Sequence, residues 1–147
     1  RATGTVFIRR DRREAQGQVA MLRERLAHGH RLLFFPEGTS TDGRRVLPFK
    51  PTLFAAFLDP GLGGGIAIQP VSLVYEAPPG EDPRFYGWWG EMDFAPHLLK
   101  VLAAPRQGRV TVIHHPPVPV APGAHRKALA AALEGSVRAG VMARLTE

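Results

Sequence analysis

The sequence is defined first by what it lacks. It contains no cysteine, which excludes disulfide bonds, thiolate nucleophiles and cysteine-bound zinc. No uncharged apolar run is long enough to span a bilayer, and no signal peptide is visible. It also lacks a Walker loop, a Rossmann fingerprint, a Gly-x-Ser-x-Gly elbow, a zinc finger, an aromatic RNA-binding signature and a basic helix with heptads.

Lysine is scarce as well, since only Lys50, Lys100 and Lys127 occur. Arginine therefore supplies most of the positive charge, and the formal net charge is +6, with 19 Lys+Arg against 13 Asp+Glu. Arginine suits forked contacts to phosphate and carboxylate. Three readings of this charge stay open: solvated surfaces, anionic lipid headgroups and nucleic acid.

The length of 147 residues and the apolar content of 44% predict one folded domain, residues 1–147. The chain begins with Arg1 rather than Met and enters a strand-like stretch at Gly4. We therefore expect a piece of a longer protein, and a membrane anchor upstream stays open.

Hydrophobic patterning predicts a strand at 6–8, a helix at 13–28 capped by Gly29, and a buried strand at 31–35. Strand, helix, strand is the unit of a parallel sheet, so we expect an α/β fold. Further predicted elements are a helix at 51–58, a strand at 66–75 disturbed by Pro70, a helix at 94–102, a strand at 109–113 and a last helix from about residue 125. The last helix has one apolar stripe that predicts a docking face, since every fourth residue is apolar at Leu129, Leu133, Val137, Val141 and Leu145.

The segment Pro36-Glu37-Gly38-Thr39-Ser40 follows the strand predicted at 31–35. Open α/β sheets bind ligands at the carboxyl ends of their strands. Gly38 allows close approach of a ligand or positive φ, the hydroxyl groups can donate, and Glu37 can fix the loop. The alternative is a tight turn with Glu37 in a surface ion pair.

Three segments in order resemble the blocks of the phospholipid/glycerol acyltransferase family. They are Gly4 to Arg10, Phe35 to Thr39 with the downstream Leu47-Pro48-Phe49-Lys50, and Ile68 to Val71. The resemblance implies a glycerol-3-phosphate acyltransferase-like α/β fold, N-terminally truncated, with a mostly parallel central sheet flanked by helices. It also implies transfer of a fatty acyl group from acyl-CoA or acyl carrier protein to a lysolipid, without a cofactor or metal.

The resemblance also implies site residues. Arg10 and the loop of Glu37, Gly38, Thr39 and Ser40 would bind the headgroup of the acceptor, and Lys50 would add positive charge. Arg9 stands where the family often has an acid, and Ser40 stands where it often has an arginine. The second departure favours a zwitterionic or non-phosphate acceptor such as lyso-ornithine lipid over 1-acyl-glycerol-3-phosphate.

The family's catalytic block is a histidine followed five positions later by an aspartate. None of the histidines here has that partner. We therefore expect no catalytic residue in this chain, which would be inactive alone, with the base upstream of Arg1. The resemblance places the parent enzyme at the cytoplasmic face of the inner membrane, peripheral or anchored by an upstream segment. Two alternatives from other classes are a non-catalytic basic lipid-headgroup-binding module and a nucleic-acid-binding basic domain.

Weaker candidates remain outside this loop. Trp88 and Trp89 would lie either at a membrane interface or in a core beneath the loop that contains them. The pair His114-His115 has no third ligand nearby in the sequence, so a polar loop is the better interpretation than a metal site.

Overall fold

The structure is a computed structural model that describes residues 15–62 and 65–146. Its elements, in chain order, are helix α1 (Ala15–Ala27), 3-10 helices η2 (Leu53–Leu58) and η3 (Pro60–Leu62), strands β1 (Ala67–Ile68) and β2 (Val71–Glu76), helix α2 (Phe94–Ala103), strands β3 (Arg109–His114) and β4 (Val118–Pro119), and helix α3 (Arg126–Leu145). The predicted helices at 51–58, 94–102 and from 125 correspond to η2, α2 and α3. The coarse α/β class is confirmed.

The strands pair in an antiparallel manner. β2 pairs with β3 from Val71 opposite His114 to Glu76 opposite Arg109, and β1 pairs with β4. The predicted strand at 66–75 is broken at Gln69-Pro70, because proline has no N–H to donate to a ladder. The carbonyl of Pro70 instead accepts from the backbone N–H of His115 at 3.0 Å.

The expected parallel sheet is absent from the part of the chain that the structure describes, where both strand pairs are antiparallel. The strand predicted at 6–8 lies outside the described residues. Residues 31–35 are extended but join no strand ladder. Their exposure alternates: Leu33 is 83% and Phe35 is 66% exposed, whereas Leu32 and Phe34 are half-buried. The prediction of a buried strand at 31–35 was therefore wrong, because the segment joins no ladder and none of its residues is buried.

Helix α1 ends as the sequence predicts. Gly29 has φ of +74°, its N–H donates to the carbonyl of Leu26 at 2.9 Å, and the N–H of His30 donates to Arg25 at 3.0 Å. This pair of hydrogen bonds is the Schellman arrangement, which satisfies carbonyl groups left free at the end of a helix.

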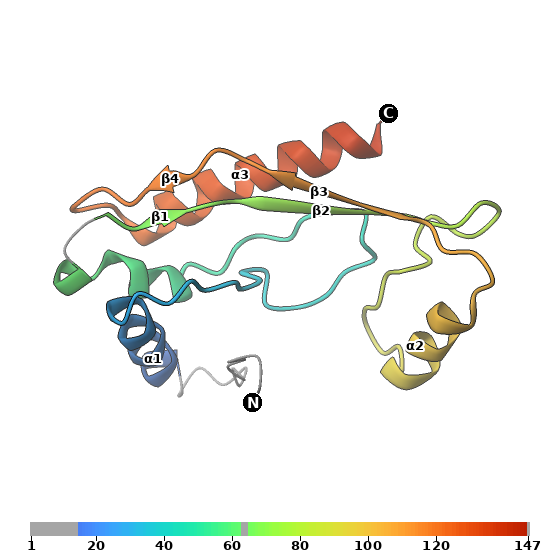
Figure 1. Ribbon diagram of the computed structural model, residues 1–147, viewed down its shortest axis with the longest axis horizontal. Coiled ribbons are helices and arrows are strands. Elements are labelled where there is room, and N and C mark those ends of the chain that lie inside the picture. Colours follow the sequence, from blue (N-terminus) through green and yellow to red (C-terminus); the bar gives the residue numbers. More distant parts are fainter. Residues whose placement is uncertain (1–14, 63–64, 147) are drawn as a thin grey trace.

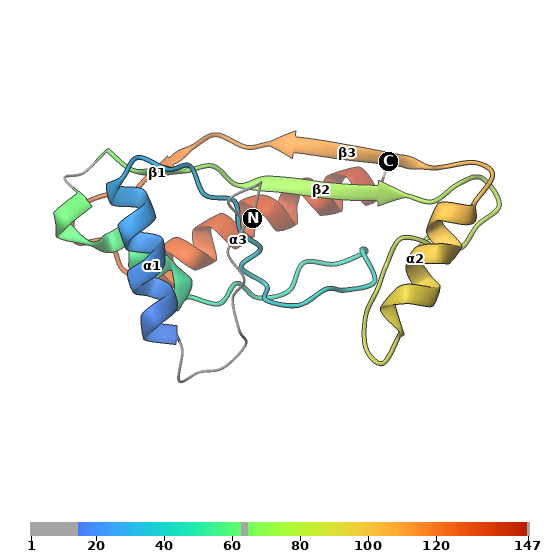
Figure 2. The same ribbon diagram turned by 60° about the horizontal axis from the view of Figure 1, so that its bottom comes forward.

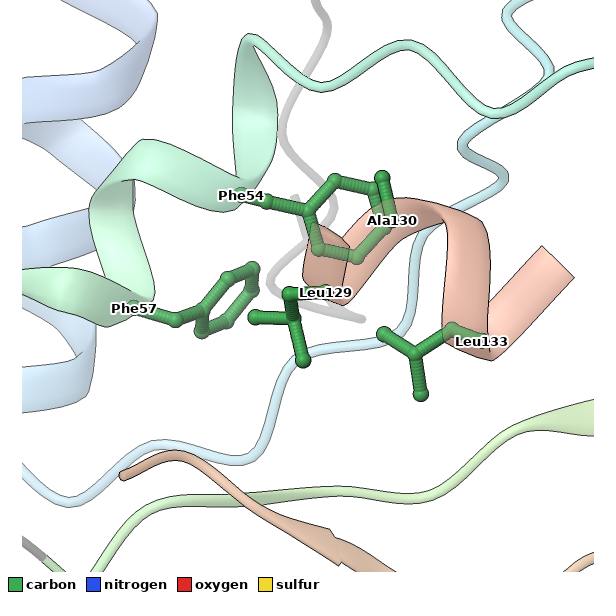
Figure 3. Close-up of a cluster of buried hydrophobic side chains, with 5 residues drawn as sticks. All are labelled: Phe54, Phe57, Leu129, Ala130 and Leu133. Carbon is green, nitrogen blue, oxygen red and sulfur yellow. The ribbon is translucent and has the colours of Figure 1, made fainter. Parts of the chain in front are cut away.

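Helix α3 lies along the strands and organises the core (Figure 1). Its N-terminal half joins one buried cluster, consisting of Phe54, Phe57, Leu129, Ala130 and Leu133. The aromatic side chains of η2 point toward the leucines of α3 in this cluster (Figure 3). The C-terminal half joins a second cluster, consisting of Val46, Val74, Val137 and Val141. The predicted four-residue stripe of α3 is thereby confirmed as its buried side.

Helix α2 lies apart from this core. It is found at the opposite end of the β2–β3 ribbon from α1, in both views of the chain (Figures 1 and 2). None of its residues is buried.

Candidate functional site: the loop of residues 36–50

The loop of residues 36–50 leaves the extended segment and returns beside it. The N–H of Gly38 donates to the carbonyl of Phe35 at 3.2 Å, which closes a tight turn. The N–H of Lys50 donates to the carbonyl of Pro36 at 2.9 Å and joins the two ends of the loop. The two sequence blocks that carry the resemblance, around Glu37 and around Pro48, are therefore neighbours in space.

Glu37 fixes this arrangement from inside the loop. Its Oε2 accepts from the backbone N–H of Leu47 at 2.7 Å. A carboxylate that accepts from an amide makes one of the stronger hydrogen bonds in a protein. This hydrogen bond agrees with the expectation that Glu37 can hold the loop by accepting from an amide, and among the described residues Glu37 has no ion pair. Its contribution to acceptor binding stays a prediction.

Gly38 and Lys50 meet at the turn. Gly38 has φ of +70°, a conformation that L-residues other than glycine adopt at a cost. A Cβ atom placed on Gly38 would lie 2.6 Å from Lys50 Nζ, so the ammonium group occupies the space that a side chain would need. Thr39 and Ser40 follow immediately and are exposed. This corner presents a cation and two hydroxyl groups to solvent, a combination suited to an anionic headgroup.

The returning segment of the loop is also held by helix α3. Glu134 Oε2 accepts from the backbone N–H of Phe49 at 3.1 Å, and Glu134 Oε1 lies 2.6 Å from Arg138 Nη2. The hydrogen bond from Arg138, and next the one from Phe49, hold the pKa of Glu134 below its ordinary value of 4.5. A carboxylate on α3 thus anchors a segment 85 residues earlier.

Asp42, which is only 9% exposed, stabilises the far end of the loop. Its Oδ1 accepts from the N–H of Arg44 at 3.1 Å. Its carboxylate also lies 3.7 Å from the guanidinium groups of Arg45 and Arg84. The backbone of Gly87 packs so closely on Asp42 that a Cβ there would lie 2.7 Å from the Asp42 carbonyl oxygen.

Sequence reasoning did not identify Asp42 or Glu134. A local signal existed for Asp42, because Asp-Gly after Thr41 is a typical Asx-turn sequence. For Glu134 the only signal was the four-residue spacing to Arg138, which any solvated helix face shows. Its contact with Phe49 depends on tertiary packing.

The structure brings together Glu37, Gly38 and Lys50, with Thr39 and Ser40 beside them, as the sequence predicts. Arg10 lies outside the described residues, so its place beside this loop stays a prediction. Within those residues, no group of three His, Asp or Glu side chains is arranged to hold a metal ion.

His115 is occupied elsewhere. The buried hydroxyl of Ser72 donates to the carbonyl of Val137 at 3.0 Å and accepts from His115 Nε2 at 2.7 Å. The two hydrogen bonds of Ser72 thereby join β2, the imidazole of His115 and the backbone of α3. This contact is structural, in agreement with the interpretation of His114-His115 as a polar segment.

The comparison with known families identifies the chain. The profile of the Acyltransferase family matches residues 1–74, which include the whole loop of residues 36–50. The chain belongs to the Acyltransferase family.

Individual relatives extend the match over this acyltransferase chain. A lyso-ornithine lipid O-acyltransferase from Rhodobacter capsulatus is 62% identical over 141 residues, which are 96% of this chain and 51% of the relative. One from Brucella abortus is 38% identical and covers 92% of the chain and 54% of the relative. A 1-acyl-sn-glycerol-3-phosphate acyltransferase from Neisseria gonorrhoeae is 41% identical over 59 residues, 40% of the chain and 23% of the relative.

The chain spans about half the length of these two lyso-ornithine lipid O-acyltransferases. No solved structure matches it. Among the described residues, no helix combines the length and the apolar character that crossing a membrane demands.

Proposed function

We propose that the protein to which this chain belongs is an O-acyltransferase that moves a fatty acyl group from an acyl thioester to the hydroxyl group of a lysolipid. Acyl-CoA and acyl carrier protein are the candidate donors. The observation that carries the proposal is the loop of residues 36–50, whose anchored turn presents Lys50, Thr39 and Ser40 in a chain of the Acyltransferase family.

In this proposal the chain holds the acceptor while the base is supplied from outside it. Residues 1–147 form the C-terminal portion of a longer catalytic domain, and a histidine upstream takes the proton from the acceptor hydroxyl. The oxygen then attacks the thioester carbonyl, the carbon–sulfur bond breaks and the thiol leaves with a proton. No metal or redox cofactor is needed for this exchange.

Lyso-ornithine lipid is the acceptor that we favour over 1-acyl-glycerol-3-phosphate. Two observations support this choice. Ser40 stands where the family often has an arginine, and a relative that is 62% identical over 96% of this chain is a lyso-ornithine lipid O-acyltransferase. The carboxylate of an ornithine headgroup needs fewer positive charges than a dianionic phosphate, and Lys50 supplies one at the turn.

The test is a steady-state assay of the full-length protein with lyso-ornithine lipid and lysophosphatidic acid as competing acceptors. We expect the higher kcat/KM with lyso-ornithine lipid. Lys50→Met should raise the acceptor KM by roughly ten-fold with little change in kcat, as loss of one charged contact predicts. Lys127→Met, at an exposed lysine on α3, is the matched control. Retained lipid binding without turnover on either acceptor would favour the non-catalytic lipid-headgroup-binding module instead.

We also propose that residues 31–35 become a strand of a mostly parallel central sheet in the complete domain. Their alternating exposure, with Leu33 and Phe35 open to solvent, supports this. Amide hydrogen exchange at these positions should be slower in the full-length protein than in the chain alone. Equal exchange in both would count against a strand.

A further inference from the structure

Helix α2 is built with its apolar side turned away from the protein. Phe94, Leu98 and Leu102 recur every four residues and share one side of the helix, with Leu99 beside them. Phe94 is 55%, Leu99 is 65% and Leu102 is 69% exposed. A helix at the surface of a globular protein normally turns such a stripe toward the core.

Lys100 links α2 to the body of the chain through a cation–π contact. Lys100 lies on the opposite side of the helix from Leu98, and its Nζ lies 5.0 Å from the centre of the Phe85 ring. Phe85 is only 4% exposed. Lys100 itself is exposed, and the half-buried residues of α2 are His97 and Val101. The opposite side of the helix, which carries Leu99 and Leu102, therefore faces solvent.

The segment before α2 extends the same apolar surface. The Trp88 ring packs edge-on against Phe94 with centroids 5.2 Å apart. Its Nε1 donates to the carbonyl of Met92 at 2.7 Å, so the indole can leave water without losing a hydrogen bond. The α2 patch, as defined here, consists of Trp88, Met92, Phe94, Leu98, Leu99 and Leu102.

From this geometry we propose that the α2 patch is a membrane-docking element that inserts into the interfacial region of an anionic lipid bilayer. The proposal rests on the proposed function in one respect, since a lysolipid acceptor resides in a membrane. Tryptophan, phenylalanine and leucine on one side of a helix, with a basic residue on the other, is the composition of interfacial amphipathic helices.

Charge and size favour lipid over a protein partner. Residues 88–109, which span the patch, contain Lys100, Arg106 and Arg109 against Glu91 and Asp93, and the whole chain carries a formal net charge of +6, which suits an anionic surface. A helix of ten residues is about 15 Å long. One face of it covers only a fraction of the roughly 800 Å² per partner that a stable protein interface buries. A second copy of the chain is therefore a poor occupant.

The two tryptophans of the chain, Trp88 and Trp89, report directly on this contact. We expect tryptophan emission to shift to shorter wavelength on mixed phosphatidylglycerol–phosphatidylcholine vesicles, and lipids brominated on the acyl chain to quench it. The Trp89→Phe variant assigns the signal to Trp88. Leu99→Glu should lower the partition coefficient about ten-fold or more, because it removes a leucine from the bilayer and adds a charge. Met142→Glu makes the same kind of change on α3, at a side chain 49% exposed, and should leave partitioning unchanged.

The outcomes separate cleanly. Equal partitioning of Leu99→Glu and Met142→Glu would overturn the proposal. It would also be overturned if the wild-type chain did not bind these vesicles. Self-association that Leu99→Glu abolishes would assign the patch to a second copy and overturn it too. A second assay, with the acceptor in detergent micelles, needs no bilayer docking. If the full-length protein shows no turnover in micelles, the proposed acyl transfer is refuted while the vesicle-binding result stands. If Leu99→Glu turns over normally in micelles but poorly on vesicles, both the acyl transfer and the membrane docking are supported.

Discussion

Removing the carboxylate of Glu37 should loosen the loop of residues 36–50 from within. Glu37 Oε2 accepts from Leu47 N–H at 2.7 Å in a half-buried setting. Glu37→Ala leaves that amide without its acceptor. A hydrogen bond to a charged group contributes about 1.5–3 kcal/mol, and partial exposure places this one toward the lower end. We expect the free energy of unfolding to fall by about 1–2 kcal/mol.

Urea unfolding of the chain, followed by circular dichroism, measures this difference. With a slope of about 2 kcal/mol/M, the midpoint should move down by roughly 0.5–1 M. Glu37→Gln keeps an oxygen acceptor and should lose less than half as much. Glu91→Ala removes an exposed acid from the loop before α2 and should change nothing. An unchanged midpoint for Glu37→Ala would refute the anchoring role.

The same variants separate two ways in which Glu37 can serve the acceptor. If Glu37 acts only by fixing the loop, Glu37→Ala raises the acceptor KM of the full-length protein and Glu37→Gln largely preserves it. If the carboxylate itself pairs with a cationic headgroup, both variants lose affinity alike, because an amide carries no charge. The hydrogen bond to Leu47 supports the first outcome.

Three further predictions concern the loop and the core. Gly38→Ala should raise the acceptor KM, because the added Cβ would displace Lys50 Nζ. Gly43→Ala controls for backbone strain, since Gly43 has a similar φ of +76° with open space around it. Phe54→Ala should lower the free energy of unfolding by about 3–5 kcal/mol, since Phe54 is 1% exposed in the core, whereas Phe94→Ala on α2 should cost far less. Glu134→Gln should flatten the pH dependence of stability. Because its pKa is depressed on folding, Glu134 stabilises the chain above pH 4.5 and loses that contribution as pH falls through the folded pKa, so the wild type and Glu134→Gln should converge in acid.

Local patterns in the sequence predicted those elements whose determinants are local. The Gly29 cap of α1 and the four-residue stripe of α3 follow from backbone preference and from spacing, and both were found. The interruption at Pro70 follows from its missing N–H. The positive φ of Gly38 was expected as one of two roles, because glycine adopts that conformation without a steric cost.

Strand direction and partner were not predictable in this way. An apolar run such as 31–35 indicates that the chain can be extended there. A ladder also needs a neighbouring strand, and contacts distant in sequence decide which strand that is. The role of Glu134 could not be predicted for the same reason. Its hydrogen bond with the N–H of Phe49 joins two segments that no sequence pattern connects. Trp88 and Trp89 allowed two interpretations. The contact of Trp88 with the exposed Phe94 of α2 favours the membrane.

The anchors of the loop of residues 36–50 lie on its two stems and at Asp42, whereas Thr39 and Ser40 at the turn are exposed. Mutations at these two positions should therefore be nearly neutral for folding. If the turn binds the acceptor headgroup as proposed, natural selection can exchange headgroup specificity there without first acquiring compensating changes in the core. On that proposal, divergence between acceptors would be concentrated at a few exposed positions such as Ser40, where a substitution has little effect on folding.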